Sequence, residues 1–401
     1  MRELSSVERE VVERAAAEPM LGQVEAWAAV NSGSRNLAGL ATMAGLLADA
    51  FSALPGELSL LDAAPADAVD SKGNAFQIEH GRNIQMKVRP EASVQLLFTG
   101  HMDTVFGADH SFQATNWLED GLLGGPGVAD MKGGIAVMLA ALKSVEASSI
   151  AHLGYEIILN SDEEVGSPGS AALIAQAARG KCAALTYEPA ALPDGTLAGA
   201  RPGSGNFAFA VRGRSAHAGR NPEDGRNAIV AAADLALRLQ RGKGSSLSVN
   251  PARVEGGGPN NVVPDLAILH VNLRPATPDD EAKAREMIEA SVALVTAEHD
   301  VAIEVHGGFG RPPKPMTPEA EALFELVKQA GADLGQQIGW HATGGVCDGN
   351  NIAACGVPVV DTMGVRGGKI HSADEYLIVD SLAERAALSA LTILRLAGGR
   401  P

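Results

Sequence analysis

Short apolar runs separated by polar turns dominate the first half of the chain. Residues 94–99, 155–160 and 182–187 have the length and composition of buried strands. Residues 133–145 are apolar on nearly all sides and predict a deeply buried helix. Strands and helices are expected to alternate to about residue 190, which indicates an α/β sheet layered by helices.

The N-terminal part, residues 5–54, is expected to form two helices. A loose apolar stripe with helical spacing runs from Val11 to Ala28, and the polar stretch 31–34 ends it. Sequence periodicity therefore places a helical layer before the first strand.

The pattern of fully apolar strands ends near residues 201–205, and strands that are apolar on one side only begin there. The elements expected beyond this point are strands at 207–211, 247–250, 267–273 and 301–305, and helices at 227–239 and 279–298. They predict a small α+β unit. The tail then returns to helices and strands, and an apolar helix over about 379–396 ends it.

The length of 401 residues predicts two domains, because single hydrophobic cores stop growing near about 250–300 residues. We expect residues 1–204 to begin a catalytic domain and residues 311–401 to complete it. Residues 205–310 would then be an inserted domain.

Charge and cysteine content limit which partners and which cellular compartment are expected for this chain. The chain has 48 acidic and 32 basic residues, a net charge of −16, which excludes nucleic acid and anionic membranes as expected partners. Cys182, Cys347 and Cys355 are odd in number and are expected to be reduced, with Cys182 in the core. We see no signal peptide and no run of about 18 apolar residues, so a cytoplasmic protein is expected.

An imidazole or acidic side chain follows each of the three apolar runs. His101 follows the first run, Glu164 the second and Glu188 the third. Ligands of open α/β sheets bind outside the carboxyl ends of the strands. We therefore expect a functional site where these three runs end.

His101 and Asp103 are two positions apart in an extended segment, so both side chains project to one face. His101 can bind a metal while Asp103 fixes the other ring nitrogen. The alternative for His101 is an ordinary loop histidine.

Asp130 is enclosed by glycines at 127, 133 and 134, which permit a tight turn before the buried helix. Its carboxylate can bridge two cations about 3.5–4 Å apart, as two-metal hydrolases require. The alternative is an N-cap for the helix that follows.

Glu163 and Glu164 are adjacent, so their side chains should diverge and serve different purposes. One can bind a metal and the other can take a proton from water. The alternative is a solvated acidic loop.

Glu188 precedes Pro189, which keeps Glu188 extended, and His371 follows a glycine-containing loop.

Two imidazoles and three carboxylates suit two divalent ions of the zinc type. Zinc, cobalt and manganese share these ligands, so the native metal stays open. The candidate ligands are His101, Asp130, Glu164, Glu188 and His371. The chemistry indicated is metal-assisted hydrolysis.

In these motifs, from about Trp27 to the C-terminus, the chain resembles a family of di-zinc metallopeptidases. The family includes glutamate carboxypeptidase of the G2 type, acetylornithine deacetylase, succinyl-diaminopimelate desuccinylase and aminoacylase. The resemblance implies a three-layer α/β catalytic domain with a mixed sheet. It also implies an inserted ferredoxin-like α+β domain that acts as lid and dimerisation domain.

The resemblance also assigns roles to the candidate ligands. It implies that His101, Asp130 and Glu188 hold one zinc, and that Asp130, Glu164 and His371 hold the other. Asp130 would bridge the two ions.

Glu163 matches the general base of the family, and Asp103 matches the carboxylate that orients His101. The family carries a non-proline cis peptide after its bridging aspartate, which corresponds to Asp130–Met131 in this chain.

Further positions match substrate residues of the family. His217 matches a histidine that reaches the partner subunit's site and stabilises the oxyanion, although alone it would be taken for a surface-turn residue. Asn261, Arg274, Arg311 and Thr343 match positions on the substrate side, and the arginines would bind a carboxylate. The alternative for the arginines is a salt bridge at the junction of the domains.

The chain departs from the pattern at Cys347, where relatives more often have serine or threonine, and residues 106–123 have no match. The expected function is hydrolysis of the amide bond of an N-acyl amino acid or short peptide with a free C-terminal carboxylate, by a homodimer. Alternatives are a deacylase of the acetylornithine or succinyl-diaminopimelate kind and an inactive peptide-binding protein.

Overall fold

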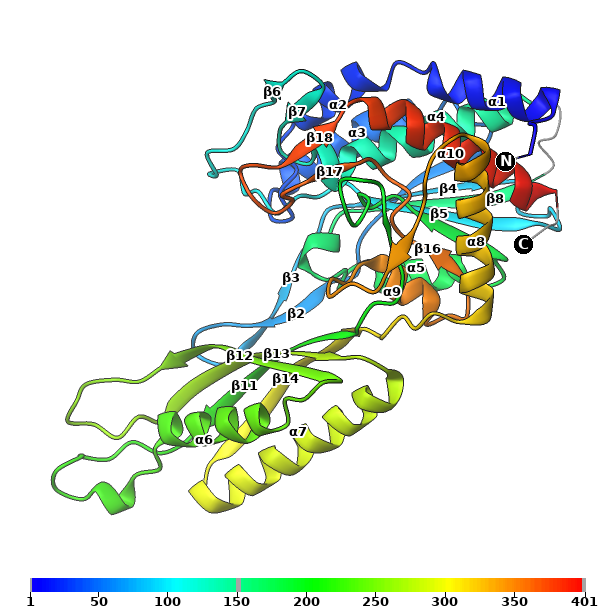
Figure 1. Ribbon diagram of the computed structural model, residues 1–401. Coiled ribbons are helices and arrows are strands. Elements are labelled where there is room, and N and C mark those ends of the chain that lie inside the picture. Colours follow the sequence, from blue (N-terminus) through cyan, green and yellow to red (C-terminus); the bar gives the residue numbers. More distant parts are fainter. Residues whose placement is uncertain (1, 149–152, 399–401) are drawn as a thin grey trace.

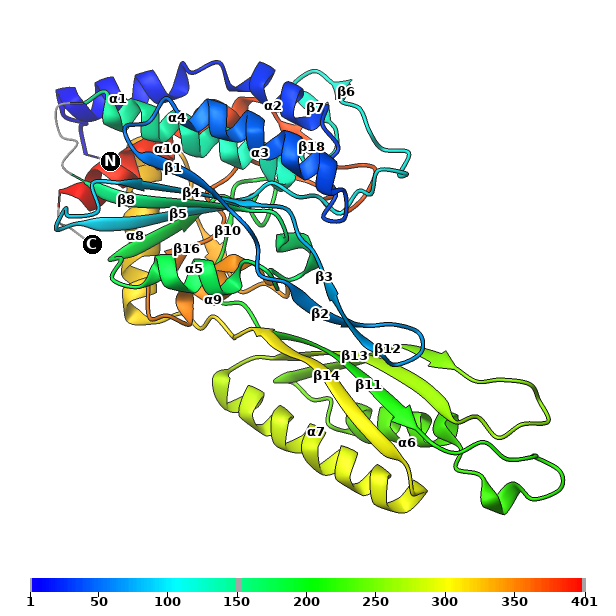
Figure 2. The same cartoon turned by 180° about the vertical axis from the view of Figure 1, so that it is seen from behind.

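The computed structural model describes residues 2–148 and 153–398 and has a mixed α/β architecture, as predicted. Figures 1 and 2 show a larger body with helices around a central sheet and a smaller body in which helices pack on a second sheet. The larger sheet has the strand order β1-β4-β8-β5-β9-β16, and the smaller sheet has the order β12-β13-β11-β14.

The larger sheet is mixed. Its strands are β1 (Glu57–Leu61), β4 (Asn83–Val88), β8 (Gly154–Asn160), β5 (Gln95–His101), β9 (Ala183–Thr186) and β16 (Val359–Val360). The four strands β8, β5, β9 and β16 run parallel, whereas β4 is antiparallel to β1 and β8. The carboxyl ends of the three predicted strands therefore lie side by side.

Helices cover both faces of this sheet. They are α1 (Ser6–Ala16), α2 (Met20–Ala28), α3 (Leu37–Phe51), α4 (Gly133–Glu146), α5 (Ala171–Ala178), α8 (Pro318–Asp333), α9 (Asp348–Ala353) and α10 (Asp380–Ala397). In Figure 1, α1 to α4 and α10 lie above the sheet, and α5 and α9 lie below it. The helix α4 is buried along nearly its whole length, as predicted. None of the helices in the described parts of the chain has both the length and the apolar character needed to cross a bilayer.

The prediction of two helices in residues 5–54 is wrong, because three form there. Pro19 separates α1 from α2, since proline has no N–H to donate and disfavours helix at the residue before it. The apolar stripe nevertheless continues across the break. Val11, Val24 and Trp27 all pack into the main core.

The expected alternation of strands and helices also fails between residues 55 and 127, all of which the structure describes. No α-helix occurs there, and the strands follow one another directly: β1 pairs with β4, β2 with β3 and β6 with β7, all antiparallel, whereas β5 joins the parallel part of the sheet. The additional strands of the larger body are β2 (Ala66–Val69), β3 (Ala75–Ile78), β6 (Asn116–Glu119), β7 (Leu122–Gly124), β10 (Leu197–Ala198), β15 (Trp340–His341), β17 (Gly367–Gly368) and β18 (Tyr376–Ile378). In sheet β17-β18-β7-β6, β18 pairs with β7, which links the C-terminal part to the segment before Asp130.

The smaller body follows the predicted pattern. Its elements are β11 (Ser204–Arg212), α6 (Ala228–Arg241), β12 (Leu247–Gly256), β13 (Leu266–Pro275), α7 (Pro278–His299) and β14 (Ala302–Arg311). The order βαββαβ with this sheet arrangement is ferredoxin-like. Its own core includes Phe209, Leu235 and Leu269.

The hairpin of β2 and β3 contacts both bodies (Figures 1 and 2). At its tip, Arg212 Nη2 of the smaller body donates to the carbonyl of Gly73 at 2.8 Å. Beyond β3, Ser161 Oγ donates to the carbonyl of Gly81 at 2.6 Å. Ser161 begins the loop that carries Glu163, so this contact helps to fix the start of that loop.

The three cysteines are free thiols, but the core position expected for Cys182 is wrong. Cys182 is exposed because the buried part of the strand begins one residue later, at Ala183.

Candidate metal centre

The carboxyl ends of β8, β5 and β9 bring candidate ligands to one edge of the larger sheet. His101 is the last residue of β5. After β8 the chain forms the short 3-10 turn η2 (Glu163–Val165), and Glu188 follows soon after β9. The site therefore lies where open α/β sheets bind ligands, as the sequence predicted.

Asp130 reaches the same edge from the turn η1 (Val128–Lys132), and its peptide bond to Met131 is cis, as expected. Its Oδ1 lies 3.2 Å from His101 Nε2, and its Oδ2 lies 3.2 Å from His371 Nε2. The N-cap alternative is wrong, because Lys132 occupies the cap position of α4 and Asp130 faces the two imidazoles.

The five candidate ligands form two groups that share Asp130. The donor atoms of His101, Asp130 and Glu188 lie within 4.8 Å of one another, and so do those of Asp130, Glu164 and His371. Glu188 Oε2 is 3.7 Å from His101 Nε2, and Glu164 Oε2 is 3.1 Å from His371 Nε2. Each group offers one imidazole nitrogen and two carboxylates, a donor set that fits a divalent ion of the zinc type.

The charges of these groups also fit cations. Burial raises the pKa of Glu188 well above its usual range, and burial together with the nearby Asp130 raises the pKa of Glu164 to about 8. Hydrogen bonds with Asp130 and Glu164 raise the pKa of His371 to about 11. Three converging carboxylates thus favour positive charge, and divalent cations would supply it in place of protons.

The centre is accessible from one side. The side chain of His101 is 1% exposed, whereas that of His371 is 53% exposed. The centre is therefore open to solvent at His371.

Asp103 supports both His101 and the acidic loop. His101 Nδ1 lies 3.0 Å from the main-chain oxygen of Asp103 and 3.4 Å from its Oδ1. The carboxylate of Asp103 also accepts the N–H groups of Glu163 at 3.1 Å and Glu164 at 3.2 Å, and the hydroxyl of Ser34 at 2.7 Å. One side chain therefore positions a ring and a loop, and the sequence indicated only the first of these contacts.

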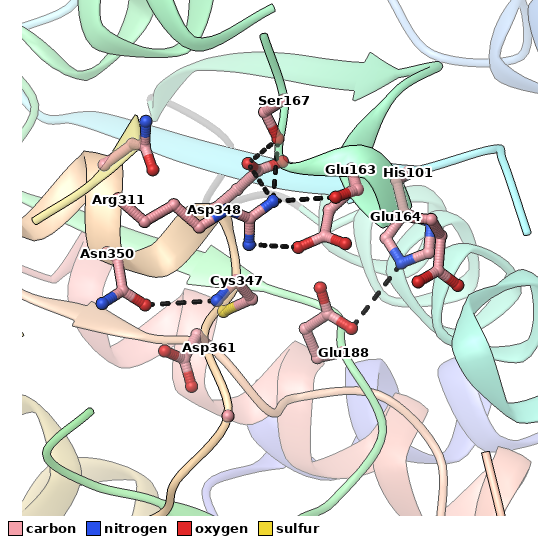
Figure 3. Close-up of polar contacts among 12 residues, drawn as sticks. His101, Glu163, Glu164, Ser167, Glu188, Arg311, Cys347, Asp348, Asn350 and Asp361 are labelled. Atoms are coloured by element: carbon pink, nitrogen blue, oxygen red, sulfur yellow. Dashed lines mark hydrogen bonds and ion pairs between the residues drawn. The ribbon is translucent and has the colours of Figure 1, made fainter. Parts of the chain in front are cut away.

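Glu163 and Glu164 diverge, as predicted. Glu164 faces His371, whereas Glu163 forms an ion pair with Arg311 (Figure 3). Glu163 is only 8% exposed, so the alternative of a solvated acidic loop is wrong.

Arg311 lies at the end of β14, where the chain returns from the smaller body. Its guanidinium donates to the main-chain oxygen of Glu163 at 2.9 Å and to Ser167 Oγ at 3.0 Å, and it lies 3.5 Å from Asp348 Oδ1 (Figure 3). The structure thus places Arg311 in a buried salt bridge at the junction, the alternative that the sequence left open.

The other residues expected on the substrate side lie in or beside the smaller body. His217 and Asn261 are exposed on two neighbouring loops, where the N–H of Ala218 donates to the carbonyl of Asn261 at 2.9 Å. Among the described residues, no hydrogen bond or ion pair connects His217 or Asn261 with the five candidate ligands.

Arg274 and Arg201 donate to neighbouring residues of one loop at the junction between the bodies. Arg274 Nη1 donates to the carbonyl of Gly344 at 2.7 Å, and Arg201 Nη1 donates to Thr343 Oγ1 at 3.3 Å. Arg274 therefore contacts the residue next to Thr343, and Arg201, which the sequence did not indicate, contacts Thr343 itself.

Asp361 anchors a buried ion cluster that was also missed. Arg201 donates to both of its carboxylate oxygens at 2.8 and 3.0 Å, and Lys314 Nζ lies 2.8 Å from Oδ2. Burial favours the protonated acid, but Arg201 and Lys314 outweigh burial and lower the pKa of Asp361 to about 2. These partners are distant in sequence, so no local pattern indicated the cluster.

We expect Asp361→Asn to lower the free energy of unfolding near neutral pH by about 3–5 kcal/mol, because it leaves two buried cations without their counterion. The folded-state pKa lies below the unfolded value, so this stabilisation is present above about pH 4 and is lost as the pH falls towards 2. Urea unfolding at several pH values measures the difference. The matched change Glu304→Gln breaks a surface pair with Arg212 and should cost less than about 1 kcal/mol. A similar small cost for Asp361→Asn would contradict the prediction.

Cys347 is buried beside this cluster and precedes α9. Burial raises the pKa of its thiol well above the usual value. The thiol therefore stays protonated near neutral pH and is a poor nucleophile.

The chain is similar to proteins of known activity. A model of peptidase family M20/M25/M40 matches residues 97–395. Carboxypeptidase G2 of Pseudomonas sp. (strain RS-16) is 32% identical over 330 residues, which cover 80% of this chain and 78% of that protein. Succinyl-diaminopimelate desuccinylase of Psychrobacter arcticus is 26% identical over 316 residues, with coverages of 73% and 76%. The crystal structure of aminopeptidase PepT from Bacillus cereus has the same fold, with a TM-score of 0.72 at 23% identity over 96% of this chain and 99% of that one.

Proposed function

Since the chain belongs to peptidase family M20/M25/M40 and is a hydrolase, we propose that it uses two zinc ions to cleave the amide bond of an N-acyl amino acid or short peptide with a free C-terminal carboxylate. The inactive peptide-binding alternative is set aside by this membership. The resemblance found in the motifs is confirmed by the family match.

One observation carries the proposal. The two oxygens of Asp130 face two different imidazoles, each of which has a further carboxylate beside it. A shared carboxylate of this kind is what a pair of bridged metal ions requires. Cobalt or manganese in place of zinc would use the same donors.

When bound, the metal pair would polarise the scissile carbonyl and acidify a water molecule. Arg311 contacts Oε1 of Glu163, so we assign proton transfer to Oε2. Oε2 takes a proton from the attacking water and delivers it to the leaving nitrogen. Asn261, Arg274 and Thr343 would bind the substrate carboxylate, and Arg311 would share that task while it orients Glu163.

The smaller body supports a role as lid and dimerisation domain, inserted at residues 205–310 between catalytic parts 1–204 and 311–401. Val230 and Leu237, seven residues apart on α6, are 51% and 60% exposed. Exposed apolar side chains one above the other on a helix favour contact with a partner. A homodimer would bring His217 of one subunit to the centre of the other.

His217 has the tautomer that this task needs. Its Nδ1 accepts the N–H groups of Gly219 at 3.1 Å and Arg220 at 3.2 Å, so a neutral ring carries its proton on Nε2. Nε2–H is then a donor for the oxyanion of the reaction.

We expect His217→Ala to lower kcat by about 10²–10³-fold, the effect of losing one oxyanion donor, with metal content unchanged. Mixing it with Glu163→Ala subunits should restore up to about a quarter of the wild-type rate, because half of randomly paired dimers are mixed and each mixed dimer keeps one complete site. Steady-state rates of the remixed subunits test this. No recovery in dimers shown to exchange subunits would mean that His217 acts within its own chain.

A hydrolysis screen tests the function itself. We would load the protein with zinc or cobalt and compare N-acyl glutamates and dipeptides with the same compounds amidated at the C-terminus. Hydrolysis of the free carboxylates alone is expected. Equal hydrolysis of the amidated compounds, or none with either metal, would reject the proposal.

The alternative is a deacylase, supported by the similarity to succinyl-diaminopimelate desuccinylase. N-succinyl and N-acetyl diamino acids in the same screen distinguish it. Greater similarity to carboxypeptidase G2 supports the first function.

A further inference from the structure

Glu375 holds the turn that carries Asp130. Its side chain is buried, and its Oε1 accepts the N–H groups of Ala129 and Asp130, each at 3.0 Å. Its Oε2 accepts the N–H of Gly127 at 3.2 Å, and its main-chain oxygen accepts the N–H of Gly125 at 3.3 Å. Four N–H groups of one turn thus donate to the single residue Glu375. Without Glu375, those of the four N–H groups that are buried would lose their hydrogen-bond acceptor.

Glu375 also belongs to the loop that carries His371. Its N–H donates to the carbonyl of Ser372 at 3.1 Å, and the next residue, Tyr376, pairs with Gly124 between β18 and β7. His371 has a φ of 62°. A non-glycine residue in this left-handed region costs about 1–3 kcal/mol and persists only where the surroundings fix it.

From this geometry we infer that Glu375 is a positioning residue, which fixes Asp130 and His371 relative to each other and thereby shapes the group Asp130, Glu164 and His371. This inference rests on the proposed metal centre and deepens it. The hydrogen bonds of Glu375 go to main-chain groups, so it acts through the two ligands whose segments it joins.

The two metal positions should depend on Glu375 to different extents. In the group with Glu164, both Asp130 and His371 depend on its contacts. In the other group only Asp130 does, because His101 ends β5 and Glu188 follows β9 in the main sheet. A residue that merely stabilised the fold would weaken both positions alike.

The test compares Glu375→Ala, Glu375→Gln and the wild type by titration of zinc against a competing chelator, followed by cobalt absorption spectra. We expect Glu375→Ala to lower the affinity of the position formed by Asp130, Glu164 and His371 about 10–100-fold, and to lower that of the position formed by His101, Asp130 and Glu188 by less. Glu375→Gln should lie between them, because its amide oxygen can keep the bonds from Ala129 and Asp130. Asp70→Asn is the matched control, since Asp70 accepts the N–H groups of Lys72 and Asn74 in the β2–β3 hairpin.

Several outcomes would overturn the inference. Equal loss at both positions, or lower thermal stability with both affinities unchanged, would show an ordinary structural role. If Glu375→Ala does not fold, Glu375→Gln provides the test, because it too should lose more zinc affinity at the position with His371 than at the position with His101. A wild type that binds no metal would overturn the proposed function and this inference together, whereas a wild type with two ions and symmetric losses overturns the inference alone.

Discussion

Glu163→Gln is expected to lower kcat by about 10²–10⁴-fold, the contribution of a well-placed general base, while metal content stays at the wild-type level. Glu163 belongs to neither ligand group, so its loss should not release metal. The amide of glutamine has nearly the same volume but takes up no proton near neutral pH. Single-turnover rates and metal analysis of the same sample measure the two effects.

Glu156→Gln is the matched control for this change. Glu156 is a buried acid of the preceding strand, β8, but it pairs with Lys181 and Gln85 away from the ligands. Its substitution should cost stability and leave kcat near the wild-type value. A Glu163→Gln enzyme with undiminished kcat would remove Glu163 from the role of base. Loss of metal in that variant would show instead that Glu163 supports the ligands.

The ligand groups could be predicted because their signal is local. His101, Glu164 and Glu188 each follow an apolar run, and parallel strands deliver whatever follows them to the same edge. Asp130 stands among glycines that mark a tight turn. The sequence pattern therefore indicates the same five side chains that the structure brings together.

The fold predicted from the sequence is wrong where a single residue outweighs a periodic pattern. The stripe from Val11 to Ala28 does continue on one side, but Pro19 divides the helix that carries it. Cys182 is one residue outside the buried part of its strand and is therefore exposed. Periodicity shows which face is buried, whereas a single residue can decide where an element ends.

The supporting polar residues could not be predicted, since their partners are distant in the chain. Asp361 pairs with Arg201 across 160 positions, and Glu375 accepts the N–H of Asp130 across 245. Nothing near either acid marks it as different from a surface carboxylate. Arg311 shows the same limit, because its match suggested substrate binding but not its contact with Glu163.

Asp130→Asn is expected to release metal from both positions and to lower kcat/KM by about 10³-fold or more. Metal-assisted polarisation is worth several kcal/mol in the transition state, and each 1.4 kcal/mol is about tenfold in rate. The amide keeps one oxygen, but its NH₂ group is no metal ligand and cannot accept from an imidazole N–H. Equilibrium dialysis with zinc, before and after the assay, measures the loss.

Two variants that each alter only one metal position show whether the loss of both ions in Asp130→Asn comes from bridging. Glu188→Gln removes a ligand from the group with His101 only, and Glu164→Gln removes one from the group with His371 only. Each should weaken one ion and leave the other, so a bridging Asp130 predicts that Asp130→Asn alone loses both. If Asp130→Asn kept one ion as tightly as the wild type, Asp130 would serve a single metal, and the two oxygens that face His101 and His371 would not reflect a shared ligand.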